Sequence, residues 1–100
     1  MNLKNKTVLI TGASSGIGKS LAYLLAARGM NVVIVARTLS RLESIAQEIE
    51  SKYPVKAYAY AQDLSKTNAA QNLYDQLKGD KIEIDLLINN AGFGKWGAFF

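Results

Sequence analysis

Three glycines stand at close spacing near the start of this 100-residue chain. Residues 11–18 have the sequence TGASSGIG and directly follow an apolar run that ends at Ile10. Gly12 allows a tight turn, Gly16 lets the backbone approach a ligand, and Gly18 lets a following helix lie against the preceding strand. The first amides of that helix and the positive end of its dipole would face the turn. The segment predicts a site for the diphosphate of a nucleotide; the alternative is a small-residue turn that binds nothing.

The same segment nearly matches a P-loop. In residues 13–20, ASSGIGKS, alanine stands where a P-loop begins with glycine, and Lys19 and Ser20 complete its Gly-Lys-Ser ending. A nucleotide hydrolase of that class also needs an acidic residue after a buried strand to hold magnesium, and only Asp63 stands in such a place. A hydrolase is therefore an alternative function, and an exposed helix lysine is the simpler interpretation of Lys19.

Composition excludes several classes of chemistry. The chain has no cysteine and no histidine, which excludes disulfides, thiolate or histidine metal sites and Ser-His catalysis. Twelve basic and eight acidic residues give a net charge of +4, which favours phosphate-bearing ligands without indicating nucleic acid. The longest apolar runs, such as residues 32–36, fall far short of the roughly 20 residues that span a bilayer. We expect a cytoplasmic protein that crosses no membrane, binds no metal and binds no nucleic acid.

Strand-like and helix-like segments alternate along the chain without a long linker or a repeat. Apolar runs predict strands over residues 8–10, 32–36, 55–61 and 84–88. Apolar spacing of three to four predicts helices over residues 16–28, from Ser40 onward, and from Ala69 to Gly79. The order βαβαβαβ, with strands of continuous apolar character, predicts the α/β class and an open, doubly wound parallel sheet in a single domain.

Two local details follow from these patterns. In the first helix, the spacing of Ile17, Leu21, Leu24 and Leu25 predicts one buried stripe. At the start of the second helix, the Ser-x-x-Glu form of residues 40–43 predicts a capping box.

The glycine segment and a second motif together resemble one enzyme family. Residues 11–18 are similar to the TGxxxGxG cofactor turn of the short-chain dehydrogenases/reductases, and residues 89–92, NNAG, are similar to the motif after strand four of that family. The resemblance spans essentially the whole chain, which corresponds to the N-terminal part of such an enzyme. It implies the Rossmann form of the sheet and hydride transfer between a nicotinamide dinucleotide and a small-molecule carbonyl or alcohol substrate, in a homo-oligomer.

The resemblance assigns cofactor-binding residues to three segments. The glycine turn would wrap the pyrophosphate and the adenosine ribose, and the residues after strand four would lie along the ribose and nicotinamide, while Asn89 mainly braces the sheet. Asp63 and Leu64 resemble the pair that places the aspartate against the adenine amino group; the alternative is that Asp63 caps a helix ahead of Ser65. The residues assigned to the turn and to the strand-four motif are Gly12, Ser14, Ser15, Gly16, Ile17, Gly18, Asn90, Ala91 and Gly92.

The end of the second strand favours NADP(H) over NAD(H). An NAD site places an acidic residue there to bind the ribose 2′-hydroxyl, whereas a 2′-phosphate requires a cation. In this chain Ala36 is followed by Arg37 and Thr38, and Arg41 adds to the same positive field. The planar guanidinium of Arg37 suits a phosphate. The alternative interpretation of Arg37 is a solvated surface residue.

The catalytic groups of the family have no counterpart in this sequence. Family enzymes use a serine and a Tyr-x-x-x-Lys pair that lies well after the NNAG motif, where the lysine lowers the tyrosine pKa. Tyr74 and Lys78 have that spacing but precede the motif, and we interpret them as a surface pair on the third helix. Residues 1–100 are thus predicted to be the cofactor-binding part of one dinucleotide-binding domain, without catalytic residues.

The missing half has a structural consequence. In the family, strand four is flanked by strand five, so a chain that stops at residue 100 leaves an open apolar edge. We expect either a fragment of a longer enzyme or two copies that complete the sheet between them, the fragment being favoured. A binding module of the same fold without turnover is a further alternative.

Overall fold

The computed structural model describes residues 2–14 and 16–90, and its elements follow the order βαβαβαβ. They are β1 (Thr7–Thr11), α1 (Gly16–Ala27), β2 (Asn31–Ala36), α2 (Leu39–Lys52), β3 (Ala57–Ala61), α3 (Ala69–Gly79) and β4 (Leu86–Asn89). The predicted order of elements is confirmed. The last strand is shifted along the chain, because Ile84 lies before it and Asn89 is its final residue.

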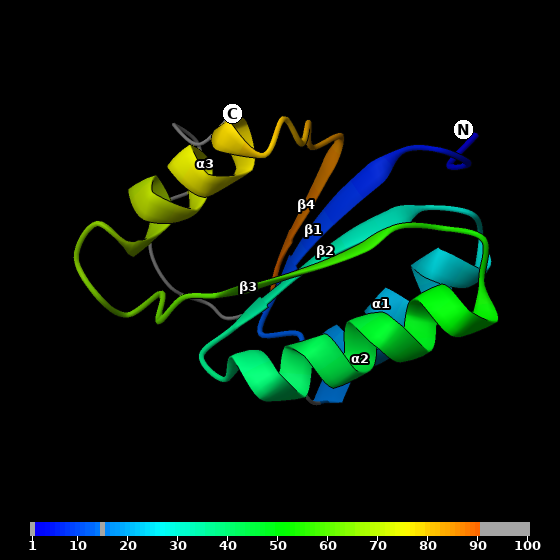
Figure 1. Cartoon of the computed structure of the whole chain (residues 1–100), viewed down its shortest axis with the longest axis horizontal. Coiled ribbons are helices and arrows are strands. Elements are labelled where there is room, and N and C mark those ends of the chain that lie inside the picture. The colour runs from blue at the N-terminus through cyan, green and yellow to red at the C-terminus, as the bar shows by residue number, and fades with distance from the viewer. Residues whose placement is uncertain (1, 15, 91–100) are drawn as a thin grey trace.

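The strands form one parallel sheet in the order β3-β2-β1-β4 (Figure 1). β1 is central, and its Ile10 is in register with Ile34 of β2 on one side and with Ile88 of β4 on the other. The chain builds outward from β1 to β3 and then crosses to the opposite side to place β4. In sheets of this kind, ligands bind beyond the carboxyl ends of the strands where the order reverses, here between β1 and β4. The predicted doubly wound parallel sheet is confirmed.

Helices cover both faces of the sheet. α1 and α2 lie on one face and α3 on the other (Figure 1). Side chains of successive strand residues alternate between the faces, so Ile10 and Ile34 pack with α1 and α2, whereas Leu9 and Val33 pack against α3. Burial from both sides explains the continuous apolar runs of β1 and β2. None of the helices in the described part of the chain has the length and apolarity to cross a bilayer.

The buried face of α1 differs from the predicted stripe. Its buried residues are Gly18, Ala22 and Ala26. Leu21 and Leu25 are half-buried, whereas Ile17 is 70% exposed and Leu24 is 51% exposed, so the prediction was wrong for these two residues. The physical reason is close packing: small residues at four-residue spacing let the helix approach the sheet, and bulkier side chains are turned outward.

α2 begins before the predicted capping box. Its N-cap is Thr38, which has an extended backbone and makes no side-chain cap hydrogen bond. The amide of Leu42 donates to the Thr38 carbonyl over 3.3 Å, and Leu42 is fully buried. Ser40 and Glu43 therefore lie inside the first turns of the helix. The capping-box prediction was wrong, because the short connection from β2 starts the helix before Ser40.

β4 is an edge strand within residues 2–90. Its first residue, Leu86, is 41% exposed, and the part of the chain that the structure describes adds no strand beyond it. The predicted open edge is therefore present in this part. Whether a further strand of a longer enzyme or a second copy of the chain pairs with that edge stays a prediction.

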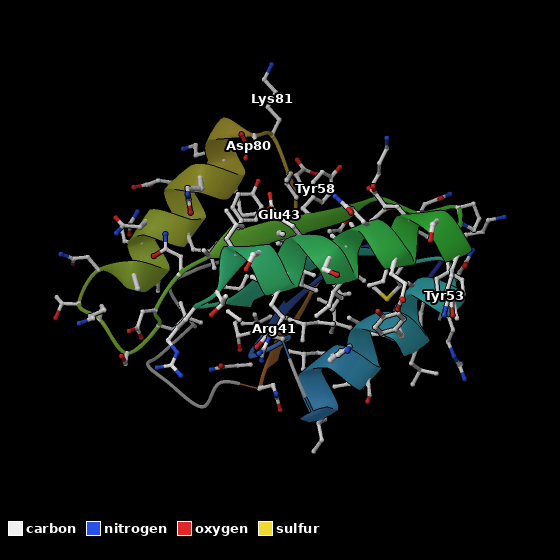
Figure 2. All side chains as sticks on the ribbon, turned by 60° about the horizontal axis from the view of Figure 1, so that its bottom comes forward. Arg41, Glu43, Tyr53, Tyr58, Asp80 and Lys81 are labelled. Carbon is white, nitrogen blue, oxygen red and sulfur yellow. The ribbon has the colours of Figure 1, made fainter. Side chains whose placement is uncertain are left out.

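Two tyrosine–carboxylate hydrogen bonds join elements near the surface. Tyr23 of α1 donates to Glu48 of α2, and Tyr60 of β3 donates to Asp80. Asp80 lies just past the end of α3 (Figure 2). Burial and then the bond to Glu48 raise the pKa of Tyr23 from 10.0 to about 12. Burial and then the bond to Asp80 also raise the pKa of Tyr60. Each bond thus requires the protonated phenol.

Replacing Leu73 tests the packing of α3. Leu73→Ala should lower the free energy of unfolding by about 2–5 kcal/mol, because it leaves a cavity between α3 and the sheet. Leu24→Ala makes the same change at an exposed position and should cost at most about 0.5 kcal/mol. Urea denaturation measures both values. Equal losses in the two variants would contradict this packing.

The Tyr23–Glu48 bond predicts a loss of stability at alkaline pH. The folded-state pKa of Tyr23 lies above its unfolded value, so the bond contributes fully below pH 10 and is lost as the pH rises toward about 12. The free energy of unfolding of Tyr23→Phe should therefore fall less steeply over this pH range than that of the unmodified chain. Urea denaturation at a series of pH values measures the difference. If the free energies of unfolding of the two chains fall equally with pH, the Tyr23–Glu48 bond does not contribute to the alkaline loss of stability.

Candidate functional site

The turn between β1 and α1 lies at the carboxyl end of the central strand. Gly12 and Gly16 both have a left-handed backbone, with φ of 64° and 59°, which strongly favours glycine. Between them, Ala13 is fully buried and donates its amide to the Val35 carbonyl of β2 over 3.2 Å. Ala13 thus anchors the turn to the neighbouring strand. Sequence reasoning noted this alanine only as a mismatch to the P-loop.

α1 approaches the turn so closely that no side chain fits at Gly18. A Cβ at this position would fall far inside contact distance of the Gly12 carbonyl and 2.9 Å from Nδ2 of Asn90. The same Asn90 amide donates to the Gly12 carbonyl oxygen over 3.3 Å. The end of β4 is therefore tied to the turn, and the start of α1 is held against both.

The backbone at Gly16 is open, in contrast to that at Gly18. A Cβ at Gly16 would meet nothing within 4 Å. The 12-residue α1 starts here, and its first turn carries no acidic side chain. The open space, the helix start and the absence of an acidic residue from the first turn of α1 fit a phosphate-bearing ligand.

A further contact joins the carboxyl ends of β1 and β4. The Thr11 hydroxyl, which is fully buried, donates to Oδ1 of Asn89 over 2.9 Å. This bond agrees with the bracing role expected for Asn89. It leaves Asn90 as the residue of the pair that reaches the glycine turn.

A pocket of about 340 Å³ opens beside the ends of β2 and β3. It is lined by Arg37, Ala61, Gln62, Asp63, Lys66, Thr67, Ala69 and Asn72. The predicted phosphate-binding arginine and the predicted adenine-binding aspartate therefore share one hollow. Arg41 does not line it; its side chain extends from the first turns of α2 on the side of α1 (Figure 2).

Ser65 holds the carboxylate of Asp63. Oδ1 of Asp63 accepts hydrogen bonds from the Ser65 amide, over 3.1 Å, and from the Ser65 hydroxyl, over 2.5 Å. These two bonds are the main reason that the pKa of Asp63 is lowered, and the charges of Arg37 and Lys66 add to the effect. The group is thus a carboxylate at neutral pH. Sequence reasoning missed this contact, although Asp-x-Ser is a recognisable turn signal.

Asp63 does not cap a helix. α3 begins only at Ala69, with Asn68 as its N-cap. The turn at Asp63 is closed instead by the Lys66 amide, which donates to the Asp63 carbonyl over 3.0 Å. The helix-cap alternative was wrong, because a separate turn precedes the helix.

The remaining predicted residues fall into two groups. Ser14 and Leu64 are half-buried, and Leu64 packs with the core on the α3 side. Thr38 is exposed at the start of α2. Ser15, Ala91 and Gly92 lie outside the described residues.

Lys19 lies on the exposed face of α1. Ser20 is exposed as well, and Lys19 lines a shallow hollow with the outward-facing Ile17 and Leu24. Its charge contributes to lowering the pKa of Glu48 on α2. These contacts agree with an exposed helix lysine.

Tyr74 and Lys78 form a pair on α3, where the Lys78 ammonium lies 6.0 Å from the centroid of the Tyr74 ring. Both residues line a hollow with Thr7, the first residue of β1. The pair therefore lies toward the amino ends of the strands. The glycine turn lies at the carboxyl ends, so the Tyr-x-x-x-Lys spacing is unrelated to the candidate site.

Comparison with known proteins gives consistent matches. Residues 6–100 match the short chain dehydrogenase family. The chain is 46% identical over 89 residues to a very-long-chain 3-oxoacyl-CoA reductase of Debaryomyces hansenii, covering 89% of this chain and 26% of the relative. It is 44% identical over 91 residues to an NADP-dependent 3-hydroxy acid dehydrogenase of Schizosaccharomyces pombe, covering 90% of this chain and 35% of the relative.

A solved structure shows the same fold. The L-sorbose reductase of Gluconobacter frateurii, in complex with NADPH and L-sorbose, superposes with a TM-score of 0.85 and 32% identity. The match covers 95% of this chain and 37% of the reductase. The chain therefore spans about a quarter to a third of the length of the curated relatives it matches, at 26% and 35%.

Two glycine substitutions test the close approach of α1. Gly18→Ala should lower the free energy of unfolding by about 3 kcal/mol, because its Cβ meets backbone that cannot easily move. Gly79→Ala is the matched control in α3, where a Cβ meets nothing within 4 Å, and it should raise stability by roughly 0.5 kcal/mol. Urea denaturation gives both numbers. Effects of the same sign and size would show that Gly18 is not confined as described.

Proposed function

The chain belongs to the short-chain dehydrogenase/reductase family, and on that premise we propose that it is the cofactor-binding part of an NADP(H)-dependent oxidoreductase. The observation that carries the proposal is the pocket that brings Arg37 and Asp63 together beside the ends of β2 and β3. The name of the fission-yeast relative and the NADPH in the sorbose reductase support the same cofactor. NADP(H), when bound, supplies or accepts the hydride.

The diphosphate of the dinucleotide lies, in this proposal, against the turn between β1 and α1. Gly16 leaves room for it, and the amides at the start of α1 point toward it. Ser14, Ser15 and Ile17 are assigned, in the same proposal, to contacts with the diphosphate and the adenosine ribose. This part of the binding depends on backbone geometry, which Gly12 and Gly18 make possible.

The adenosine end takes its selectivity from side chains. Arg37, with Thr38 beside it, binds the 2′-phosphate by charge-assisted hydrogen bonds. β2 ends at Ala36 and is followed by Arg37, so no carboxylate stands there to repel the phosphate. Asp63 accepts a hydrogen bond from the adenine amino group, and Leu64 lies beside it.

The nicotinamide end is assigned to the residues after β4. Asn90, Ala91 and Gly92 lie along its ribose and ring in this proposal. The substrate in this proposal is a small-molecule carbonyl or alcohol, and we assign no residue among 1–100 to moving its proton. We also propose that the working enzyme is a homo-oligomer.

Titration with reduced nucleotides, followed by their fluorescence, tests the cofactor. NADPH should bind more tightly than NADH. Arg37→Asp should weaken NADPH binding by roughly 10- to 100-fold, because a charge-assisted phosphate contact is replaced by repulsion, and should change NADH binding little.

The matched control is Arg28→Asp, which makes the same change of charge at an exposed residue just after α1. It should leave the preference for NADPH unchanged. Equal losses of NADPH and NADH in Arg37→Asp would refute the 2′-phosphate contact. Absence of NADPH binding to the unmodified chain would refute the proposed function.

A further inference from the structure

We infer that Ser65 is a positioning residue for base recognition: by holding the Asp63 carboxylate, it lets the site select adenine over a purine that lacks the 6-amino group. The inference rests on the proposed function, because it assumes that a dinucleotide binds with its base at Asp63. It adds a residue to which the sequence assigned no binding role.

The geometry of the two bonds defines what Ser65 does. Its amide and its hydroxyl both donate to Oδ1 of Asp63, over 3.1 Å and 2.5 Å. Because both bonds end on the same oxygen, they restrain the orientation of the carboxylate, and neither of them uses Oδ2, which can accept from a ligand. Asp63 lines the pocket beside β2 and β3, so the group that is fixed is the one a base would meet.

Fixing this carboxylate matters because of its surroundings. Arg37 and Lys66 line the same pocket, and both act on the charge of Asp63. Without the Ser65 hydroxyl, the carboxylate is held by the Ser65 amide alone and turns more readily toward these two cations, so ordering it again on binding reduces the affinity. Ser65 therefore keeps Asp63 available to the base and Arg37 available to the phosphate.

The Ser65 hydroxyl can be removed without loss of the turn. The Lys66 amide donates to the Asp63 carbonyl over 3.0 Å, and the Ser65 amide bond to Oδ1 remains in any variant with a backbone amide. Ser65 is exposed, so its truncation leaves no cavity in the core. Ser65→Ala therefore changes the restraint on one carboxylate and little else.

A pair of nucleotides separates base recognition from general binding. Adenine presents an amino donor at position 6, whereas hypoxanthine presents a carbonyl acceptor there. A fixed carboxylate accepts from the amino group and repels the carbonyl oxygen. The probes are NADPH and reduced nicotinamide hypoxanthine dinucleotide phosphate, whose phosphates and nicotinamides are identical.

The test compares the affinities of both nucleotides by fluorescence titration. The unmodified chain should prefer NADPH. Ser65→Ala should weaken NADPH binding by roughly 3- to 10-fold and change binding of the hypoxanthine nucleotide by less than about 2-fold, so the preference narrows. Ser65→Thr keeps the hydroxyl and should prefer NADPH over the hypoxanthine nucleotide as strongly as the unmodified chain does.

Asp63→Ala should abolish the preference for NADPH. Adding Ser65→Ala to the Asp63→Ala variant should then change neither affinity further.

The matched control is Ser51→Ala, whose hydroxyl donates to the Glu48 carbonyl of α2 over 2.7 Å. It should leave both affinities unchanged, and circular dichroism should show that every variant is folded. Equal weakening of both nucleotides by Ser65→Ala, or an unchanged preference, would overturn the inference while the Arg37 result still supports the cofactor. If NADPH does not bind the unmodified chain, the proposed function and this inference fail together.

Discussion

The arrangement of the site depends on the absence of a side chain at Gly18. Because nothing projects from this position, α1 lies directly against the Gly12 carbonyl and the amide of Asn90. That contact fixes the helix start beyond the end of the central strand and leaves the backbone at Gly16 open. Ala13 ties the same turn to β2. Three strands and one helix thus meet at a single turn, which gives a mobile and highly charged ligand a rigid support.

The candidate site divides its work between backbone and side chains. At the turn, amides and glycine conformations can hold a diphosphate of any dinucleotide, so this part is general. At the pocket, Arg37 and Asp63 would decide, in the proposed function, which adenosine is accepted, and Ser65 bonds to the carboxylate of Asp63. Selectivity therefore resides in exposed or half-buried residues after β2 and β3. Such residues can change between relatives without disturbing the core.

The sequence was sufficient for the order of elements and the sheet class, because strands buried on both faces carry continuous apolar runs. It failed for the inner face of α1, where Ile17 and Leu24 are exposed. The apolar pattern places large side chains on the buried face, whereas close packing against the sheet requires the small residues of this helix. Ser40 resembled a cap, but the length of the connection from β2 placed the helix start earlier. The glycine turn was located correctly, whereas the Ser65 contact depends on the local turn at Asp63, which the apolar periodicity does not describe.

The position of β4 beside β1 has a consequence for biosynthesis. The hydrogen bond from Thr11 to Asn89 joins positions 78 residues apart, whereas β2 follows β1 after a single helix. During translation, β1 can pair with β2 early. The backbone groups on the other edge of β1 have no strand partner until β4 has left the ribosome. The bond from Asn90 to the Gly12 carbonyl also joins positions 78 residues apart. One edge of the buried strand β1 therefore cannot be paired before the chain has been synthesised as far as Asn89, so the sheet is completed only after β2 and β3 are available.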